Sequence, residues 1–218
     1  MNSKFKCFIF DLDGTLIDTV EDLAAAFNHM RKELGFPQVS TAMVQQMIGN
    51  GVRDLICQSF DNVNIKPTED ELANAIKLMI DYYNAHLVVK TAAYPGVADT
   101  LEFMHKKGIK TAVVTNKRAE AALGLLKLLG LAEYLDCIIG DRPGLQLKPA
   151  PDGLLAAASE LGMQISDCVM VGDNHTDLGA ARACNMQSIF CHYGFGSKGN
   201  ETADYDIEQF AELKDFIQ

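Results

Sequence analysis

Residues 8–16 read Phe-Ile-Phe-Asp-Leu-Asp-Gly-Thr-Leu, an apolar run that leads two carboxylates into a glycine turn. In a strand, residues two apart point to the same side, and ligands bind at the strand ends of an open α/β sheet. Asp11 and Asp13 would repel each other there unless a cation lay between them. The stretch therefore indicates a metal-dependent catalytic centre at the end of a buried strand.

Calcium-binding loops and ordinary turns also begin with Asp-x-Asp-Gly. A calcium loop needs further oxygen ligands at alternate positions and a glutamate at its twelfth position. Here the chain turns apolar after Thr15, and the twelfth position is Asp22. The calcium loop is therefore disfavoured, and an ordinary turn remains the alternative for this stretch taken alone.

The composition limits the class of protein. The chain has 218 residues, enough for one large domain or for a medium domain with an insertion. Its formal net charge of −10 argues against a nucleic-acid or membrane partner, so an anionic substrate would need a local cation. The six cysteines form no Cys-x-x-Cys pair, and neither a leader sequence nor a membrane span is recognisable. We therefore expect a soluble cytoplasmic protein with reduced cysteines.

Apolar runs typical of strands alternate with helical periodicity through most of the chain, which is the pattern of a parallel sheet. The intervening helices have one apolar face each, as Val97, Leu101 and Met104 illustrate. The sequence thus predicts an α/β fold, with a Rossmann-like parallel sheet and helices on both faces. The expected strands are 7–10, 110–114, 137–139, 168–171 and 188–191.

The stretch 17–92 breaks this alternation, because it contains helical patterns and no convincing strand. Apolar residues at helical spacing mark amphipathic helices at 20–34 and 72–87, with shorter helices expected at 43–48 and 52–60. We therefore expect an all-helical cap domain at 17–92, inserted after the first strand. The core domain would consist of 1–16 and 93–218.

Three further polar groups follow expected strands or turns. Thr115 and Asn116 end the second strand, where a helix start would offer backbone N–H groups to an anion. Lys148 precedes a proline-containing turn, and Asp173 and Asp177 follow the fourth strand. Each group alone could be a helix cap or a solvated surface charge. Their order nevertheless favours one shared site, because the carboxyl ends of parallel strands meet at one edge of a sheet.

These motifs together resemble those of the haloacid dehalogenase superfamily of phosphohydrolases, over essentially the whole chain. The helical insertion is similar to that superfamily's small helical cap, and its Gly-Asn-Gly stretch at 49–51 resembles the cap of phosphoglycolate phosphatases. Dehalogenases lack an acid at the position of Asp13, so the resemblance implies a phosphatase. The motifs are Asp11-x-Asp13-Gly14-Thr15, Thr115-Asn116, Lys148-Pro149, and Gly172-Asp173 with Asp177.

The resemblance implies magnesium-dependent hydrolysis of a small phosphate monoester through an aspartyl-phosphate. Asp11 would attack phosphorus, while Asp13 would protonate the leaving oxygen and then activate water. Asp11, Asp173 and the Asp13 carbonyl would bind Mg²⁺, and Asp177 would orient metal-bound water. Lys148 would bridge the phosphate and Asp11 as a point charge.

The same resemblance implies that Thr115 and the Asn116 backbone hold phosphate oxygens. Phosphoglycolate also carries a carboxylate, for which Arg53 in the cap is the candidate partner, with a plain surface charge as its alternative reading. Pyrophosphatase, nucleotidase and sugar-phosphate phosphatase activities stay open, and a phosphosugar mutase is disfavoured. A non-catalytic metal- or phosphate-binding regulator is the alternative from another class. The expected partner is a small phosphorylated metabolite, and the sequence leaves the oligomeric state open.

Overall fold

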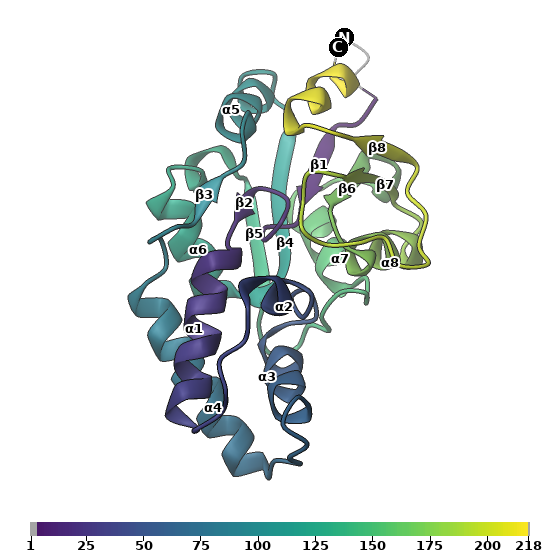
Figure 1. Ribbon diagram of the computed structural model, residues 1–218. Helices are drawn as coiled ribbons and strands as arrows, with labels where there is room; N and C mark the ends of the chain where they lie inside the picture. The colour runs from purple at the N-terminus through teal and green to yellow at the C-terminus, as the bar shows by residue number, and fades with distance from the viewer. Residues whose placement is uncertain (1–3, 218) are drawn as a thin grey trace. The chain divides into compact units, whose positions relative to one another are not determined.

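The computed structural model of the protein describes residues 4–217, which form two compact units (Figure 1). One unit runs up to Asp18 and resumes at Ala92, and the other is Thr19–Thr91. The first unit contains a six-stranded sheet, and the second is helical. Each unit is considered by itself below.

The sheet of the first unit is parallel throughout, in the order β5-β4-β1-β6-β7-β8. The strands are β1 Cys7–Phe10, β4 Lys110–Arg118, β5 Cys137–Asp141, β6 Cys168–Gly172, β7 Gln187–Cys191 and β8 Tyr205–Ile207. Strand β1 is central, and all four of its residues are buried because both faces of the sheet are covered. The strand order reverses at β1, and such a switch point opens a crevice at the carboxyl ends of the strands.

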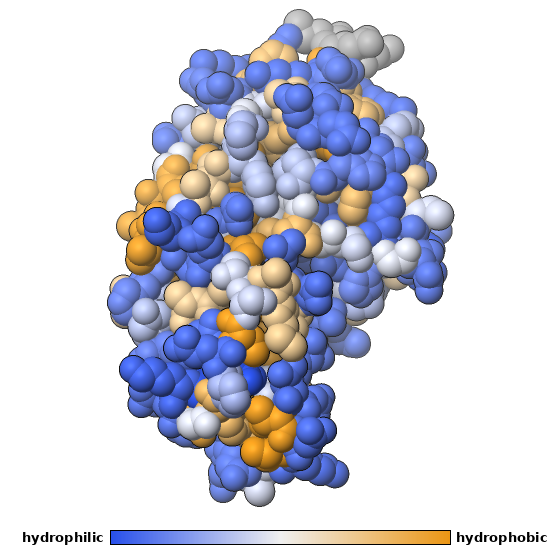
Figure 2. Space-filling model, in the orientation of Figure 1, coloured by the Kyte–Doolittle hydropathy of each residue, from blue (hydrophilic) through white to orange (hydrophobic). Residues whose placement is uncertain are grey.

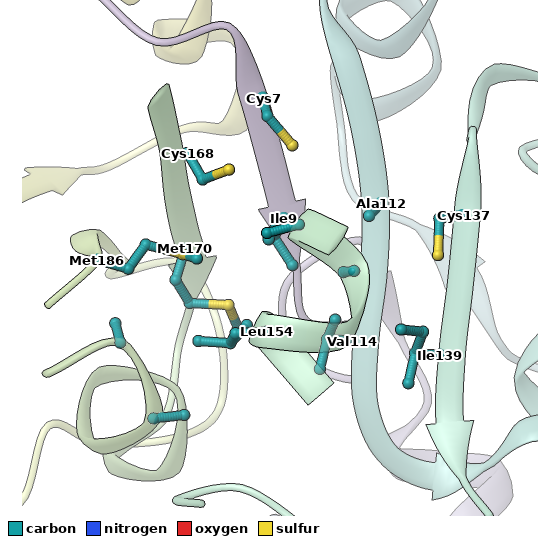
Figure 3. Close-up of a cluster of buried hydrophobic side chains, with 14 residues drawn as sticks. Cys7, Ile9, Ala112, Val114, Cys137, Ile139, Leu154, Cys168, Met170 and Met186 are labelled. Carbon is teal, nitrogen blue, oxygen red and sulfur yellow. The ribbon is translucent and has the colours of Figure 1, made fainter. Parts of the chain in front are cut away.

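Helices cover both faces of this sheet. They are α5 Val97–Lys106, α6 Ala119–Leu128, α7 Asp152–Glu160 and α8 His175–Ala183, with 3₁₀ helices η1 Ala132–Tyr134, η2 Ile165–Asp167 and η3 Phe210–Phe216. Cys7 and Ile9 of β1 share an apolar cluster with side chains of α7 and α8 (Figure 3). On the opposite face, Phe10 packs on Phe210, with ring centroids 5.5 Å apart. The expected α/β fold with a covered parallel sheet is confirmed.

The cysteines of the chain are core groups. All six are free thiols, and four of them are buried. Cys7 of β1 and Cys168 of β6 are register partners, and Figure 3 shows them on adjacent strands. A hydrogen bond with Cys168, together with burial, raises the pKa of the Cys7 thiol well above its ordinary value. The Cys7 thiol is therefore neutral and serves packing.

The second unit consists of helices joined by short loops. They are α1 Val20–Glu33, α2 Thr41–Gln45, α3 Val52–Asp61 and α4 Glu69–Ala85. Helix α4 begins with a capping box, in which Thr68 and Glu71 bond each other's backbone N–H. The buried guanidinium of Arg31 donates to the carbonyls of Pro37 and Ser59 and to the Ser59 hydroxyl. Arg31 thereby ties the end of α1 to the end of α3.

The structure differs from the sequence-based expectation at the ends of the insertion. Strand β2, Ile17–Asp18, pairs antiparallel with β3, Ala92–Ala93, so the expectation of no strand in 17–92 is wrong there. A two-residue strand has too few residues to show a hydrophobic period. All four expected helical segments are present, although α2 ends at Gln45 and α4 begins at Glu69.

Strand β4 and the last strand also differ from expectation. β4 continues four residues beyond the predicted 110–114, and α6 begins only at Ala119 with Arg118 as its N-cap. Thr115 and Asn116 therefore do not cap that helix. The extension was not predicted because residues 115–118 are polar, and Arg118 pairs with Asp141 only after a register shift. β8 has three residues and was not predicted at all.

Most of the visible surface is hydrophilic (Figure 2), in keeping with the net charge of −10. Exposed large apolar side chains occur in both units, and in the described part of the chain they are Ile65, Val88, Val89, Leu123, Leu128 and Leu155. Scattered exposure of this kind is normal for a folded protein. Among residues 4–217, no helix is both long and apolar enough to cross a membrane.

Asp22 fastens the two ends of the helical unit to each other. Its buried carboxylate accepts hydrogen bonds from the backbone N–H groups of Val89, Lys90 and Thr91 and from the Thr91 hydroxyl. Burial raises the pKa of Asp22, but these hydrogen bonds outweigh it and lower the pKa overall. The ionised form of Asp22 therefore stabilises the folded unit.

Asp22→Asn is expected to lower the free energy of unfolding by about 2–3 kcal/mol at about pH 7, because an amide replaces a charged acceptor. The folded pKa of Asp22 lies below the unfolded one. The contribution is therefore complete above the unfolded pKa and disappears as the pH falls through the folded pKa. Urea unfolding of wild type and variant at about pH 7 and about pH 3 checks both statements. A stability gap of equal size at both pH values would contradict this role.

Candidate active site

The carboxyl ends of β1 and β6 bring three acids together. Asp11 follows β1, Asp173 follows β6, and Asp177 lies in the first turn of α8. One carboxylate oxygen from each lies within 4.8 Å of the others. Asp173 and Asp177 are fully enclosed, and Asp11 is 9% exposed. Asp11 lies near the start of the 218-residue sequence, and Asp173 and Asp177 lie far along it. All three nevertheless meet at one edge of the sheet, as the order of the motifs in the sequence predicts.

Lys148 provides the cation among these acids. Its buried ammonium lies 2.8 Å from Asp11 Oδ1 and donates to Asp177 Oδ1 and to the Val114 carbonyl, both at 2.7 Å. The three N–H donors of the ammonium therefore have three acceptors. Burial lowers the pKa of Lys148, but the two carboxylates outweigh it and raise the pKa overall. Lys148 is thus a permanent positive charge beside Asp11.

The acids nevertheless carry more negative charge than Lys148 offsets. Burial, together with the charge of Asp177, raises the pKa of Asp11 to about 7 in spite of Lys148. Burial and the charges of Asp177 and Asp11 raise the pKa of Asp173 to about 8. A further cation would relieve this repulsion, and an all-oxygen donor set suits a hard divalent ion. The residues present therefore fit a divalent metal held by Asp11 and Asp173.

The two oxygens of Asp177 already have partners in the protein. Oδ1 accepts from Lys148 at 2.7 Å, and Oδ2 accepts the backbone N–H of Asn174 at 3.0 Å, which completes a capping box at the start of α8. A carboxylate held in this way orients its neighbours and has little freedom to move toward a ligand. Asp177 accordingly fixes the direction of the Lys148 ammonium.

Asn116 holds the main chain at Lys148. Its amide Nδ2 donates to the Lys148 carbonyl at 2.9 Å, and the Lys148 N–H donates to Asn116 Oδ1 at 2.8 Å. The Thr115 hydroxyl accepts the N–H of Lys117 at 3.2 Å. Thr115, Asn116 and Lys148 therefore lie together at the carboxyl end of β4, where the sequence motifs place them.

Asp13 has a partner that sequence reasoning missed. Lys117 Nζ lies 2.8 Å from Asp13 Oδ2, and both side chains are largely enclosed. The available signal was Lys117 itself, which directly follows the Thr115-Asn116 motif. Arg53 belongs to the helical unit, where its exposed guanidinium pairs with Glu69 at 2.9 Å.

A glycine-containing loop after β7 was also missed. The Gly196 N–H donates to Asp173 Oδ2 at 2.8 Å, and the Thr15 hydroxyl donates to Asp173 Oδ1 at 3.0 Å. The Tyr193 hydroxyl donates to the Thr15 carbonyl at 2.8 Å. Two glycines shortly after a strand, at 194 and 196, were the sequence signal. This loop fixes the orientation of the Asp173 carboxylate.

Gly196→Ala is expected to weaken divalent-metal affinity by about 10- to 100-fold, the usual effect of disturbing a ligand's support. An added Cβ would lie 2.5 Å from the Asp173 carbonyl oxygen and 2.9 Å from Asn174 Nδ2, so the loop must shift away from Asp173. Calorimetric titration with Mg²⁺ measures the change, with Gly124→Ala inside α6 as the control. Unchanged affinity in the Gly196 variant would contradict this support role.

Comparisons with known proteins agree with this geometry. Residues 8–191 match the family described as haloacid dehalogenase-like hydrolase. The phosphoglycolate phosphatase of Chromobacterium violaceum is 32% identical over 220 residues, which cover 100% of this chain and 99% of that relative. The phosphoglycolate phosphatase of Neisseria meningitidis is 38% identical over 188 residues, covering 86% and 80%.

A solved structure extends the similarity to three dimensions. It is described as a predicted phosphoglycolate phosphatase from Haemophilus somnus, and it superposes with a TM-score of 0.91 at 27% identity. The alignment covers 99% of each chain. The extent of the family match, together with the order of the motifs along the sheet edge, means that this chain belongs to the haloacid dehalogenase-like hydrolases.

Proposed function

We propose that the protein is a magnesium-dependent phosphatase of small phosphate monoesters and that phosphoglycolate is its preferred substrate. The observation that carries this proposal is the buried Lys148 ammonium, 2.8 Å from Asp11 Oδ1 in a cluster of three acids. Such a site combines a nucleophile with the positive charge that a phosphate dianion needs. The relatives named phosphoglycolate phosphatase support the choice of substrate.

The first step is transfer of the phosphoryl group to the protein. An Asp11 carboxylate oxygen attacks phosphorus, the bond between phosphorus and the ester oxygen breaks, and the leaving oxygen takes a proton from Asp13. Lys148 offsets the charge of the phosphoryl group, and Thr115 and the Asn116 N–H bind its oxygens. Asp11, Asp173 and the Asp13 carbonyl hold Mg²⁺, which supplies the remaining positive charge when bound.

The second step regenerates the enzyme. Asp13, now a carboxylate, accepts a proton from water as the water oxygen attacks phosphorus of the aspartyl-phosphate. The bond between phosphorus and the Asp11 oxygen breaks, which releases inorganic phosphate and restores the Asp11 carboxylate. We assign the helical unit, Thr19–Thr91, the role of a cap that selects the leaving part of the substrate.

Steady-state hydrolysis across a panel of small phosphates, with and without Mg²⁺, tests this function. The panel contains phosphoglycolate, p-nitrophenyl phosphate, pyrophosphate, nucleoside monophosphates and sugar phosphates. Turnover that needs Mg²⁺, with the highest kcat/KM on phosphoglycolate, is the expected result. A preference for another member would reassign the substrate, and isomerised sugar phosphates would identify a mutase. The absence of turnover on every member would favour a non-catalytic binding protein.

Arg53→Ala is expected to raise KM for phosphoglycolate about tenfold, the effect of losing one charged hydrogen bond to the substrate carboxylate. KM for p-nitrophenyl phosphate, which has no carboxylate, should change less than about twofold. Glu69→Ala is the matched control, since it removes the ion-pair partner of Arg53 and keeps the guanidinium. Equal increases in KM for both esters would remove Arg53 from the substrate site.

A further inference from the structure

Lys117 is an enclosed lysine at the edge of the site for which the proposed function has no role. Its ammonium lies 2.8 Å from Asp13 Oδ2, and the two side chains are only 8% and 13% exposed. Enclosing two charges has a desolvation cost, which a flexible surface lysine avoids. The pair is therefore a specific part of the site.

The local backbone structure positions Lys117 beside Asp13. The register between β4 and β5 shifts between Val114 and Arg118, and irregularities of this kind redirect side chains next to active sites. The Lys117 N–H is bonded to the Thr115 hydroxyl at 3.2 Å. A Cβ at Gly140 would lie 2.7 Å from the Lys117 carbonyl oxygen, so only glycine in β5 allows this close approach. The Lys117 backbone is thus held by the Thr115 hydroxyl and by the close approach of β5.

The two acids of the Asp-x-Asp motif have different lysines as partners. Lys148 lies against Asp11 and Asp177, and Lys117 lies against Asp13. The bond to Oδ2 restricts rotation of the Asp13 carboxylate about its side-chain torsions. Proton transfer requires a positioned group, because small misplacements reduce rates strongly.

We propose that Lys117 is a positioning residue for the phosphatase reaction, holding the Asp13 carboxyl group in place for proton transfer to the leaving oxygen. Lys117 itself transfers no proton and forms no bond to phosphorus. This inference rests on the proposed function, in which Asp13 gives a proton to the ester oxygen and later accepts one from water.

Comparison of two ester types with Lys117→Met tests the proposal. An alkyl phosphate such as phosphoglycolate needs a proton on its leaving oxygen, whereas p-nitrophenolate leaves without one. kcat/KM, which reports the transfer to Asp11, is expected to fall about 30- to 100-fold on the alkyl ester and less than about threefold on p-nitrophenyl phosphate. On the latter ester, slow hydrolysis of the aspartyl-phosphate should appear as a burst of p-nitrophenol.

A double-mutant cycle separates action through Asp13 from independent action. In an Asp13→Asn background, Lys117→Met is expected to lower kcat/KM on the alkyl ester by less than about twofold further. Lys110→Met is the matched control, because Lys110 pairs with Asp136 at 2.7 Å at the other end of β4. Lys110→Met should leave the ratio of kcat/KM for the two esters unchanged. Lys117→Leu, which also removes the hydrogen-bond donor, replaces Lys117→Met if the latter does not fold.

Two results would overturn the proposal. An equal loss of kcat/KM on both esters would assign Lys117 to phosphate binding or to structure. An additive loss in the Asp13→Asn background would show that Lys117 acts without Asp13. The wild type tests the proposed function separately, since a wild type that hydrolyses no ester overturns that function and the role of Lys117 with it. Wild-type turnover with either of the two results above overturns the role of Lys117 alone.

Discussion

Asp11→Asn is expected to lower kcat on the preferred phosphate ester by on the order of 10⁴- to 10⁶-fold, which is the range for removal of a nucleophile. The amide keeps the shape of the side chain but has no anionic oxygen to attack phosphorus. The substitution also leaves Lys148 bonded to Asp177 and to the Val114 carbonyl. Steady-state and single-turnover assays on the same ester measure the loss.

The Asp11→Asn variant should remain folded, so its loss of activity can be attributed to the chemical step and not to unfolding. Burial and the charge of Asp177 raise the pKa of Asp11, so the folded protein gains little from ionising this group. Thermal unfolding without metal should therefore place the variant within about 1 kcal/mol of wild type. Asp167→Asn, in an exposed pair with Lys6, is the control and should keep full activity. Turnover by Asp11→Asn within about tenfold of wild type would exclude Asp11 as the nucleophile.

Lys148→Met is expected to lower the free energy of unfolding by about 3–5 kcal/mol in the absence of divalent metal, as for the removal of one partner of a buried ion pair. The ammonium is enclosed, and its loss removes the cation that pairs with both Asp11 and Asp177. Activity should fall together with stability, since Lys148 lies 2.8 Å from the Asp11 oxygen that we propose attacks phosphorus. Urea unfolding at equal ionic strength gives the stability difference.

Two further measurements decide whether unbalanced negative charge causes the loss of stability in Lys148→Met. Lys148→Met combined with Asp177→Asn removes one uncompensated acid and should recover part of the lost stability. Mg²⁺ should raise the Tm of Lys148→Met more than that of wild type, because the cluster then holds more unbalanced negative charge. A loss below about 1 kcal/mol, or a double variant no more stable than the single one, would contradict this account.

Much of the core could be predicted because its causes are local. Strand β1 is buried on both faces, so Cys7–Phe10 is a continuous apolar run that periodicity detects. The acids come directly after apolar strands, and parallel strands end at one edge. These two facts suffice to bring Asp11, Asp173 and Asp177 together, with Lys148 among them.

The strand segments that the sequence did not predict are all short or polar. β2, β3 and β8 are each two or three residues long, below the length at which a period can be recognised. The polar end of β4 is a strand only because Arg118 pairs with Asp141 of its neighbour. Such segments take their conformation from partner strands and not from their own residue pattern.

The sequence by itself determined the fold class, the positions of most strands along the chain and the sheet edge at which the acids collect, because burial of a strand or helix leaves a local pattern of apolar residues. Only the tertiary structure decided which groups pair there. Lys117 and Asp13 are 104 residues apart, and Thr15 and Asp173 are 158 apart. Hydrogen bonds and ion pairs between residues so far apart in the sequence depend on the strand register and on loop positions that must be correct to within tenths of an ångström. The local pattern of residues determines neither of these.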